Sequence, residues 1–162
     1  MKIVCFLGLL VSGIFASEVN FIALPDNGVQ PQALVDSKGV LHVVFLSGKS
    51  AASEVMHATF DESSHCFSKP TRVNSIKGTA VTVGSIRGAQ CAFGRDDRLH
   101  IVWNGNQMSE DGKRSMNVFY THSTASGSFE PEIALMKSGK FLDGGATVAA
   151  DTSGHVYAMW HA

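Results

Sequence analysis

Charged side chains are scarce in this 162-residue chain: they make up 17% of residues, with 13 Lys and Arg against 14 Asp and Glu. The net charge of -1 gives no electrostatic reason to expect nucleic acid or an anionic membrane as a partner. Long stretches with an apolar residue about every 3.6 positions are also missing, which argues against a helical fold.

Cysteines are few as well. Cys5 belongs to the N-terminal segment, which leaves Cys66 and Cys91 in the rest of the chain. Two thiols permit one disulfide in an exported protein, but we favour two unpaired cysteines because neither belongs to a dense cysteine framework. The seven histidines stand at no short ligand spacing, so the sequence predicts no metal site, and nothing in it implies a cofactor.

What the chain does contain points to β-structure. Its length is that of one ordinary domain, and 44% apolar residues are enough to bury a core. Sixteen glycines and ten phenylalanines, with few long helix formers, favour short strands joined by turns.

The first 16 residues have the composition of a secretory signal peptide. Lys2 supplies a positive charge, residues 3–15 are apolar apart from two glycines and one serine, and Ala16 is a small residue before Ser17. The apolar run is shorter than the roughly 18 residues that a membrane-spanning helix needs. We therefore expect a secreted or periplasmic protein that begins near Ser17 and keeps no stable membrane span.

An internal repeat is the most informative feature. The segment QALVDSKGVLHVVF (residues 32–45) aligns with QCAFGRDDRLHIVW (residues 90–103) at an offset of 58 residues. A third copy, TVAADTSGHVYAMW (residues 147–160), follows at a further 57. Each copy is an apolar run, a polar turn and a second apolar run that ends in an aromatic residue. The Asp, Ser and Gly of the first and third turns favour tight hairpins, and the second turn tolerates a left-handed residue.

Two further strand-like runs follow each of the first two copies, so one repeat is four short strands in about 57 residues. Four-stranded antiparallel sheets repeated around an axis are the blades of a β-propeller. A sandwich also has short strands at regular spacing, but it does not make them self-similar at a long fixed period. We predict an all-β fold of propeller blades at about residues 31–75, 88–136 and 145–162.

About two and a half blades are present in this prediction, whereas closed propellers have roughly four to eight. We therefore expect the chain to be the N-terminal part of a longer protein. The alternative is a small protein that completes itself by self-association, which open sheet edges would favour.

Two turns resemble the Asp-box of the sialidase, or neuraminidase-like, BNR-repeat propellers, which reads Ser-x-Asp-x-Gly-x-Thr-Phe/Trp. STASGSF (residues 123–129) keeps the Ser, the Gly, a hydroxyl and the Phe, with Ala125 at the Asp position and one residue fewer. FDESSHCF (residues 60–67) keeps the length and the closing Phe, with Glu62 at the Asp position. The resemblance covers nearly all of the exported chain. It implies sialidase-like blades, because Asp-boxes are rim turns that report on fold and not on activity.

The resemblance also implies carbohydrate chemistry. Sialidases of this fold hydrolyse terminal sialic acid, using three arginines on the substrate carboxylate, an Asp acid/base, and a Tyr nucleophile activated by a Glu. The first of these arginines precedes the first inner strand, where this chain reads GVQPQ (residues 28–32). The catalytic residues are therefore unknown in this segment, and the sequence leaves open whether the protein is an enzyme.

Four residues are candidates for ligand binding. Arg87 precedes the inner strand of the second repeat, which begins near Gln90, and it aligns with Val29, so the repeat itself does not require an arginine there. Asp143 stands at the same lip before the third copy, and His161 follows its last strand. The competing interpretations are a solvated loop arginine and an aspartate that supports a Gly-Gly turn.

Matching residues of the copies are expected to serve packing. His42 and His100 occupy the same repeat position, which predicts a shared, hydrogen-bonded role within the blades. Trp103 and Trp160 also match and are expected to pack between blades.

The expected function is thus an exported sialidase-like propeller that binds glycan or, in its full-length form, hydrolyses glycosides as an exo-α-sialidase does. The alternative is a non-catalytic scaffold for protein–protein interaction, with a polar loop such as residues 104–114 as its surface.

Overall fold

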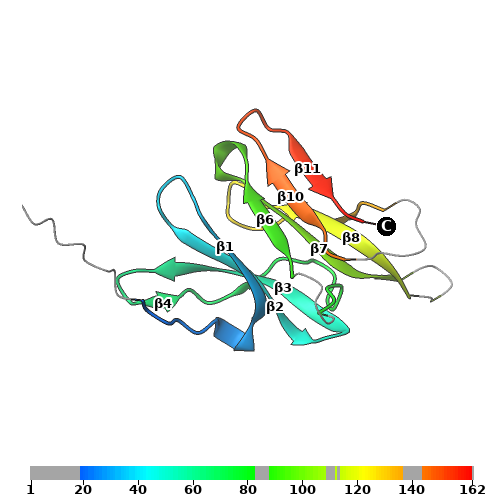
Figure 1. Ribbon diagram of the computed structural model, residues 1–162, viewed down its shortest axis with the longest axis horizontal. Helices are drawn as coiled ribbons and strands as arrows, with labels where there is room; N and C mark the ends of the chain where they lie inside the picture. The colour runs from blue at the N-terminus through cyan, green and yellow to red at the C-terminus, as the bar shows by residue number, and fades with distance from the viewer. Residues whose placement is uncertain (1–18, 83–87, 109–111, 113, 137–143, 162) are drawn as a thin grey trace, which may run out of the picture.

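The computed structural model describes residues 19–82, 88–108, 112, 114–136 and 144–161 (Figure 1). This part of the chain is built from antiparallel sheets, and its only helical elements are the 3-10 turns η1 (Pro25–Asn27) and η2 (Arg95–Asp97). The predicted all-β fold is confirmed. None of the described helices is long and apolar enough to cross a membrane, and the expected signal peptide lies outside the described residues.

In the described residues, eleven strands form three antiparallel groups. The first sheet contains β1 (Val29–Val35), β2 (Leu41–Lys49), β3 (Ala52–Asp61) and β4 (Cys66–Phe67), with β5 (Thr71–Arg72) also paired to β3. The second sheet contains β6 (Gln90–Phe93), β7 (Leu99–Met108), β8 (Arg114–His122) and β9 (Ile133–Ala134). A third hairpin pairs β10 (Thr147–Ala150) with β11 (Val156–Met159).

The sequence repeat is also a structural repeat, because the first two strands of each copy pair in the same register. The corresponding pairs are Gln32 with Val44, Gln90 with Val102, and Thr147 with Met159. The equivalence extends to the outer strands, since Met56 pairs with Arg72 in the first sheet and Phe119 pairs with Ala134 in the second.

The hairpin turns have the predicted chemistry. One carboxylate oxygen of Asp36 accepts the backbone N–H groups of Lys38 and Val40, at 2.9 and 2.8 Å. Asp151 accepts the N–H of His155 in the same way at 2.9 Å. Glycines with positive φ complete both turns, and in the second copy two aspartates adopt the left-handed conformation instead. These residues are Gly39, Gly154, Asp96 and Asp97.

Apolar side chains fill the spaces between neighbouring sheets. Val44 of the first sheet and Ile101 and Trp103 of the second share one core, while Val102 and Val148 share another between the second sheet and the third hairpin. Trp103 is 1% exposed and stacks on a neighbouring ring, which confirms its expected role in packing between sheets. Its counterpart Trp160 is 37% exposed, and its packing between sheets stays a prediction.

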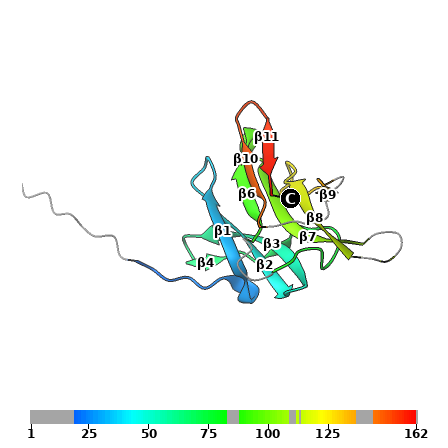
Figure 2. The same ribbon diagram turned by 45° about the vertical axis from the view of Figure 1, so that its right-hand side comes forward.

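The first strands of the three repeats lie side by side. β1 contacts β6, and β6 contacts β10; Figures 1 and 2 both show β6 and β10 as neighbours. Close approach between sheets requires small residues: a Cβ on Gly88 would overlap the Gln30 carbonyl, and one on Gly105 would overlap the Thr79 carbonyl. The described sheets do not close into a ring.

Both described cysteines are free, as predicted. Cys66 is exposed in β4, and Cys91 is buried in β6. Burial raises the pKa of the Cys91 thiol to about 12, so this side chain behaves as a small apolar residue of the core.

Candidate functional site

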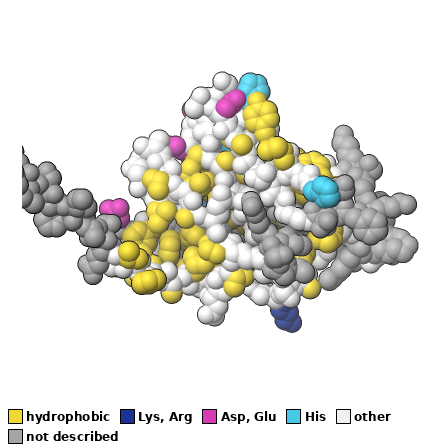
Figure 3. Space-filling model, viewed as in Figure 1, with side chains coloured by type: hydrophobic (Ala, Val, Ile, Leu, Met, Phe, Trp, Pro, Cys, Tyr) yellow, Lys and Arg dark blue, Asp and Glu magenta, His cyan; other side chains and the backbone are white. Residues whose placement is uncertain are grey.

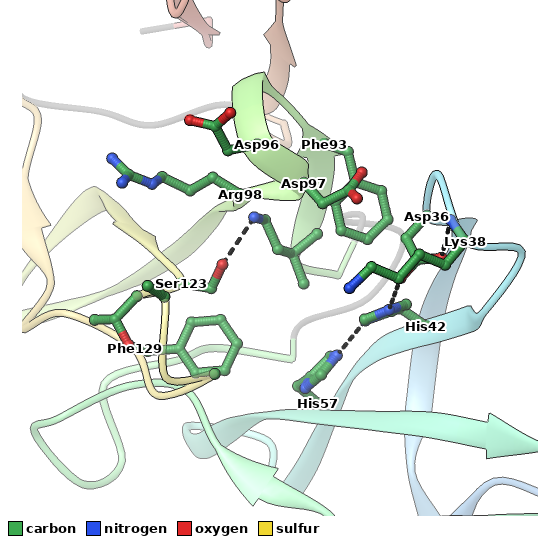
Figure 4. A pocket seen from close by; sticks show the side chains of 14 residues that line it. Asp36, Lys38, His42, His57, Phe93, Asp96, Asp97, Arg98, Ser123 and Phe129 are labelled. Atoms are coloured by element: carbon green, nitrogen blue, oxygen red, sulfur yellow. Dashed lines mark hydrogen bonds and ion pairs between the residues drawn. The ribbon is translucent and has the colours of Figure 1, made fainter.

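A pocket of about 370 Å³ lies between the first two sheets, at the end where their hairpin turns are found (Figure 4). The first sheet contributes Asp36 and Lys38 from the β1–β2 turn and the facing pair His42 and His57 from β2 and β3. The second sheet contributes the end of β6, the η2 turn and the turn after β8. The volume is within the range of small-molecule sites in proteins.

A hydrogen-bonded row of three side chains forms one wall of the pocket. His42 Nδ1 lies 2.9 Å from His57 Nε2, and His42 Nε2 lies 3.4 Å from Asp36 Oδ2. The two imidazoles are stacked, with centroids 5.1 Å apart. If the carboxylate accepts the Nε2–H of His42, then Nδ1 of the neutral His42 ring accepts the Nε2–H of His57, and the row has a consistent direction.

The protonation states of the row follow from its surroundings. The Val40 N–H holds the pKa of Asp36 below its ordinary value; burial opposes this, and the Lys38 N–H and His42 add to the lowering. Burial, and then the charge of His42, lower the pKa of His57 to about 4. His57 is therefore neutral at pH 7 and offers hydrogen bonds but no charge.

The second repeat contains the same pair in a different form. His100 Nδ1 lies 2.8 Å from the Tyr120 hydroxyl, and Tyr120 pairs with Val102 as His57 pairs with Val44. The expectation of a shared, hydrogen-bonded histidine is thus confirmed. Burial, then His122 and Arg98, lower the pKa of His100 to about 4.

The carboxylate is the element that the second repeat lacks. Gly94 occupies the repeat position of Asp36, and a Cβ at Gly94 would press against both His100 and Ala150. The third hairpin thus packs closely on Gly94. His42 lines this pocket, whereas His100 is not among its lining residues.

Two cations and two aromatic rings complete the pocket. Lys38 and Arg98 are exposed, and within the described part of the chain neither side chain makes a hydrogen bond or ion pair. The ring of Phe93 packs edge-on against His42, with the ring centroids 5.1 Å apart. The ring of Phe129 packs edge-on against His57, with the ring centroids 5.6 Å apart. Figure 4 shows the Phe93 and Arg98 side across from the histidine row.

Several other polar groups of the pocket are committed to holding the structure together. Asp97 accepts hydrogen bonds from the N–H of Ser37, at 3.2 Å, and from its hydroxyl. These bonds join the β1–β2 turn of the first sheet to the η2 turn of the second. Ser123 Oγ accepts the Leu99 N–H at 2.9 Å. The groups left for a ligand are therefore the two cations, His57, the rings and the exposed Asp96, whose Oδ2 also lies 3.7 Å from Arg95 Nε. This set suits a molecule with several hydroxyl groups and some apolar surface.

Two of the residues predicted from the sequence, Gln90 and His161, lie at the opposite end of the sheets. Gln90 is the first residue of β6, is half-buried, and donates its side-chain amide to the carbonyl oxygens of Gly88 and Ala89, at 3.4 and 3.3 Å. His161 is exposed, two residues beyond β11. Both lie where β6 and β10 begin.

The other two predicted residues, Arg87 and Asp143, lie outside the described residues. The sequence reasoning missed the inter-sheet pocket, His57 and Arg98. The available signal was the matched pair His42 and His100, which marked the position but not the partner across the strand.

Comparisons with known proteins add no relative to this description. No family model matches the chain, and no curated protein matches it at a significant level. Among the described residues, no three His, Cys, Asp or Glu side chains gather in a way that could hold a metal ion.

Proposed function

We propose that this chain supplies the blades of an exported, secreted or periplasmic, β-propeller protein of the sialidase-like type that binds glycan. The observation that carries the proposal is the common hairpin register of the three repeats together with the contacts of β1 with β6 and of β6 with β10. The blades of a β-propeller are likewise repeated antiparallel sheets around one axis, with their first strands next to one another. In this proposal the two sheets and the third hairpin are blades.

The rim turns support the resemblance to sialidase-like blades. Phe60 pairs with Phe67 in the first sheet, and Ser123 bridges to Phe129 at the matching place in the second. In the second turn the N–H of Thr124 donates to the Ser128 carbonyl at 2.7 Å. Both Asp-box-like segments thus turn the chain from the third strand into the outer strand.

The chemistry of the inter-sheet pocket supports a glycan as the ligand. Sugars present many hydroxyl groups, which donate and accept hydrogen bonds, and apolar C–H faces that pack on rings. Lys38 and Arg98 supply unpartnered donors, which also suit an acidic sugar, and Phe129 supplies a ring. Hydrolysis of a sialoside is the enzymatic form of this proposal, and it is tested separately below.

The binding experiment compares matched pairs of cations. The chain is titrated with sialylated and neutral oligosaccharides and followed by saturation-transfer NMR. The Lys38→Ala/Arg98→Ala variant is expected to weaken binding at least about tenfold, because it removes both free donors. The Lys69→Ala/Arg72→Ala variant, which removes an exposed Lys and Arg outside this pocket, should bind as the original chain does.

Absence of glycan binding, or equal weakening by both variants, would count against the proposal and favour the protein-scaffold alternative. For the enzymatic form, the full gene product is assayed on a fluorogenic sialoside, with Arg87→Ala as the comparison. Activity that depends on Arg87 would establish a sialidase, and binding without turnover would establish a lectin-like propeller.

A further inference from the structure

The exposed large apolar side chains are gathered on two surfaces of the described chain. Seven of ten belong to these surfaces, and hydrophobic side chains gather over the first sheet and again over β11 in Figure 3. The head surface consists of Val19, Phe21, Ile22, Val29 and Val35. The tail surface consists of Tyr157 and Met159. Exposed patches of this kind mark interaction sites.

The tail surface corresponds to a side that is covered in the other two repeats. Met159 pairs with Thr147 as Val102 pairs with Gln90. Val102 and the matching Val44 are fully buried, because the next sheet packs on each of them. Met159 is 57% exposed. The tail surface is therefore the side of the third hairpin on which a following sheet would pack.

The head surface corresponds to the opposite side of such a contact. Ala33 of β1 occupies the repeat position of Cys91 in β6 and Val148 in β10. Cys91 and Val148 are 4% and 8% exposed, because each packs on the preceding sheet, whereas Ala33 is exposed. Val35, two residues further along the same face, is 60% exposed. The head surface is therefore the side on which a preceding sheet would pack.

We propose that the tail surface of one copy of this chain packs against the head surface of a second copy. The two surfaces are the two halves of a contact that the chain makes twice internally, between β1 and β6 and between β6 and β10. A second copy carries both halves, so it supplies each surface with the partner that its repeat position requires. The contact is head-to-tail, so copies either close into a ring or extend as a chain.

This inference rests on the blade-like packing of the proposed function, but the two can fail separately. A monomeric chain that binds glycan would overturn self-association alone. An associating chain that ignores glycan would overturn glycan binding alone.

The test is a complementation experiment read by sedimentation velocity and light scattering across a range of protein concentrations. Met159→Lys disables the tail and Val35→Lys disables the head; both side chains are exposed, so circular dichroism should show an unchanged sheet signal. The original chain is expected to associate, and each variant alone to be monomeric. An equimolar mixture of the two variants is expected to form a one-to-one complex, because one intact head then meets one intact tail. Ile133→Lys, at an equally exposed apolar residue outside both surfaces, is the control and should associate normally.

Three results would overturn the proposal. The first is an original chain that stays monomeric throughout the concentration range. The second is association that persists in Met159→Lys or Val35→Lys, or that is lost equally in Ile133→Lys. The third is a mixture that forms no complex, since a symmetric contact made by one surface alone cannot be restored by mixing.

Discussion

The first and second repeats share a backbone plan but differ at the turn end. Both pair their strands in one register, and both hydrogen-bond a β2- or β7-strand histidine to a side chain of the next strand. In the first repeat Asp36 extends this pair and a pocket opens beside it, whereas in the second Gly94 takes that position and the third hairpin packs closely. The repeat scaffold therefore places the two histidines equivalently, and the first of them, joined to Asp36, lines the pocket.

The shared scaffold itself should be most sensitive at its buried aromatic residues. Trp103→Ala removes the largest fully buried side chain and leaves a cavity between the first two sheets, so we expect a loss of roughly 3–5 kcal/mol in the free energy of unfolding. Trp103→Phe should cost clearly less, because much of the volume stays filled. Urea unfolding followed by fluorescence or circular dichroism measures both, and equal losses for the two variants would show that packing is not the cause.

Acid should destabilise the fold through both histidine pairs. The folded-state pKa of His57 is about 4, below the ordinary value of 6.5, so the unfolded chain binds more protons between these values. Stability is full above about pH 6.5 and falls as the pH drops towards 4, by on the order of 3 kcal/mol from His57. His100 acts in the same direction.

Urea unfolding at a series of pH values tests this comparison. Below about pH 6.5 the free energy of unfolding is expected to fall, which gives an acid limb in its pH profile. His57→Gln should remove most of the His57 contribution to this fall, because glutamine cannot bind the proton that destabilises the fold. His100→Gln should flatten the acid limb too, and the double variant more than either. An acid limb unchanged in His57→Gln would show that other groups cause the acid sensitivity.

The turn carboxylates offer a finer comparison between the first and third repeats. Asp36→Ala and Asp151→Ala each remove the acceptor of backbone N–H bonds in an exposed hairpin, so both should lower the melting temperature slightly and to a similar extent. Asp36→Ala should also change the imidazole NMR signals of His42, to which Asp36 is joined. A large loss from one variant only would show that the two turns are not equivalent.

Thiol reactivity should distinguish the two sheets without altering stability. Cys66 is exposed, while burial raises the pKa of Cys91 to about 12. A thiol reagent is therefore expected to label Cys66 in the folded chain and Cys91 only after unfolding. Rapid labelling of both cysteines in native buffer would contradict the buried position of β6.

The sequence was sufficient for the repeats and their turns, because both are written in local residue patterns. The offset of the copies predicted the shared register, and Asp36 and Gly39 predicted the turn. The pocket could not be predicted in this way. His57 lies 15 residues from His42, and their meeting depends on the register of β2 with β3 and on the neighbouring sheet that supplies Arg98. Residues that meet across two sheets have no characteristic separation along the chain, so no spacing pattern in the sequence predicts their contact.

The most direct test of this account is an NMR titration of the chain with sialylated and neutral oligosaccharides, observing the imidazole signals of its histidines. If the first repeat carries the glycan site, the signals of His42 and His57 shift saturably while those of His100 stay in place. Unchanged signals, or equal shifts at His100, would contradict the claim that the open pocket of the first repeat distinguishes it from the second.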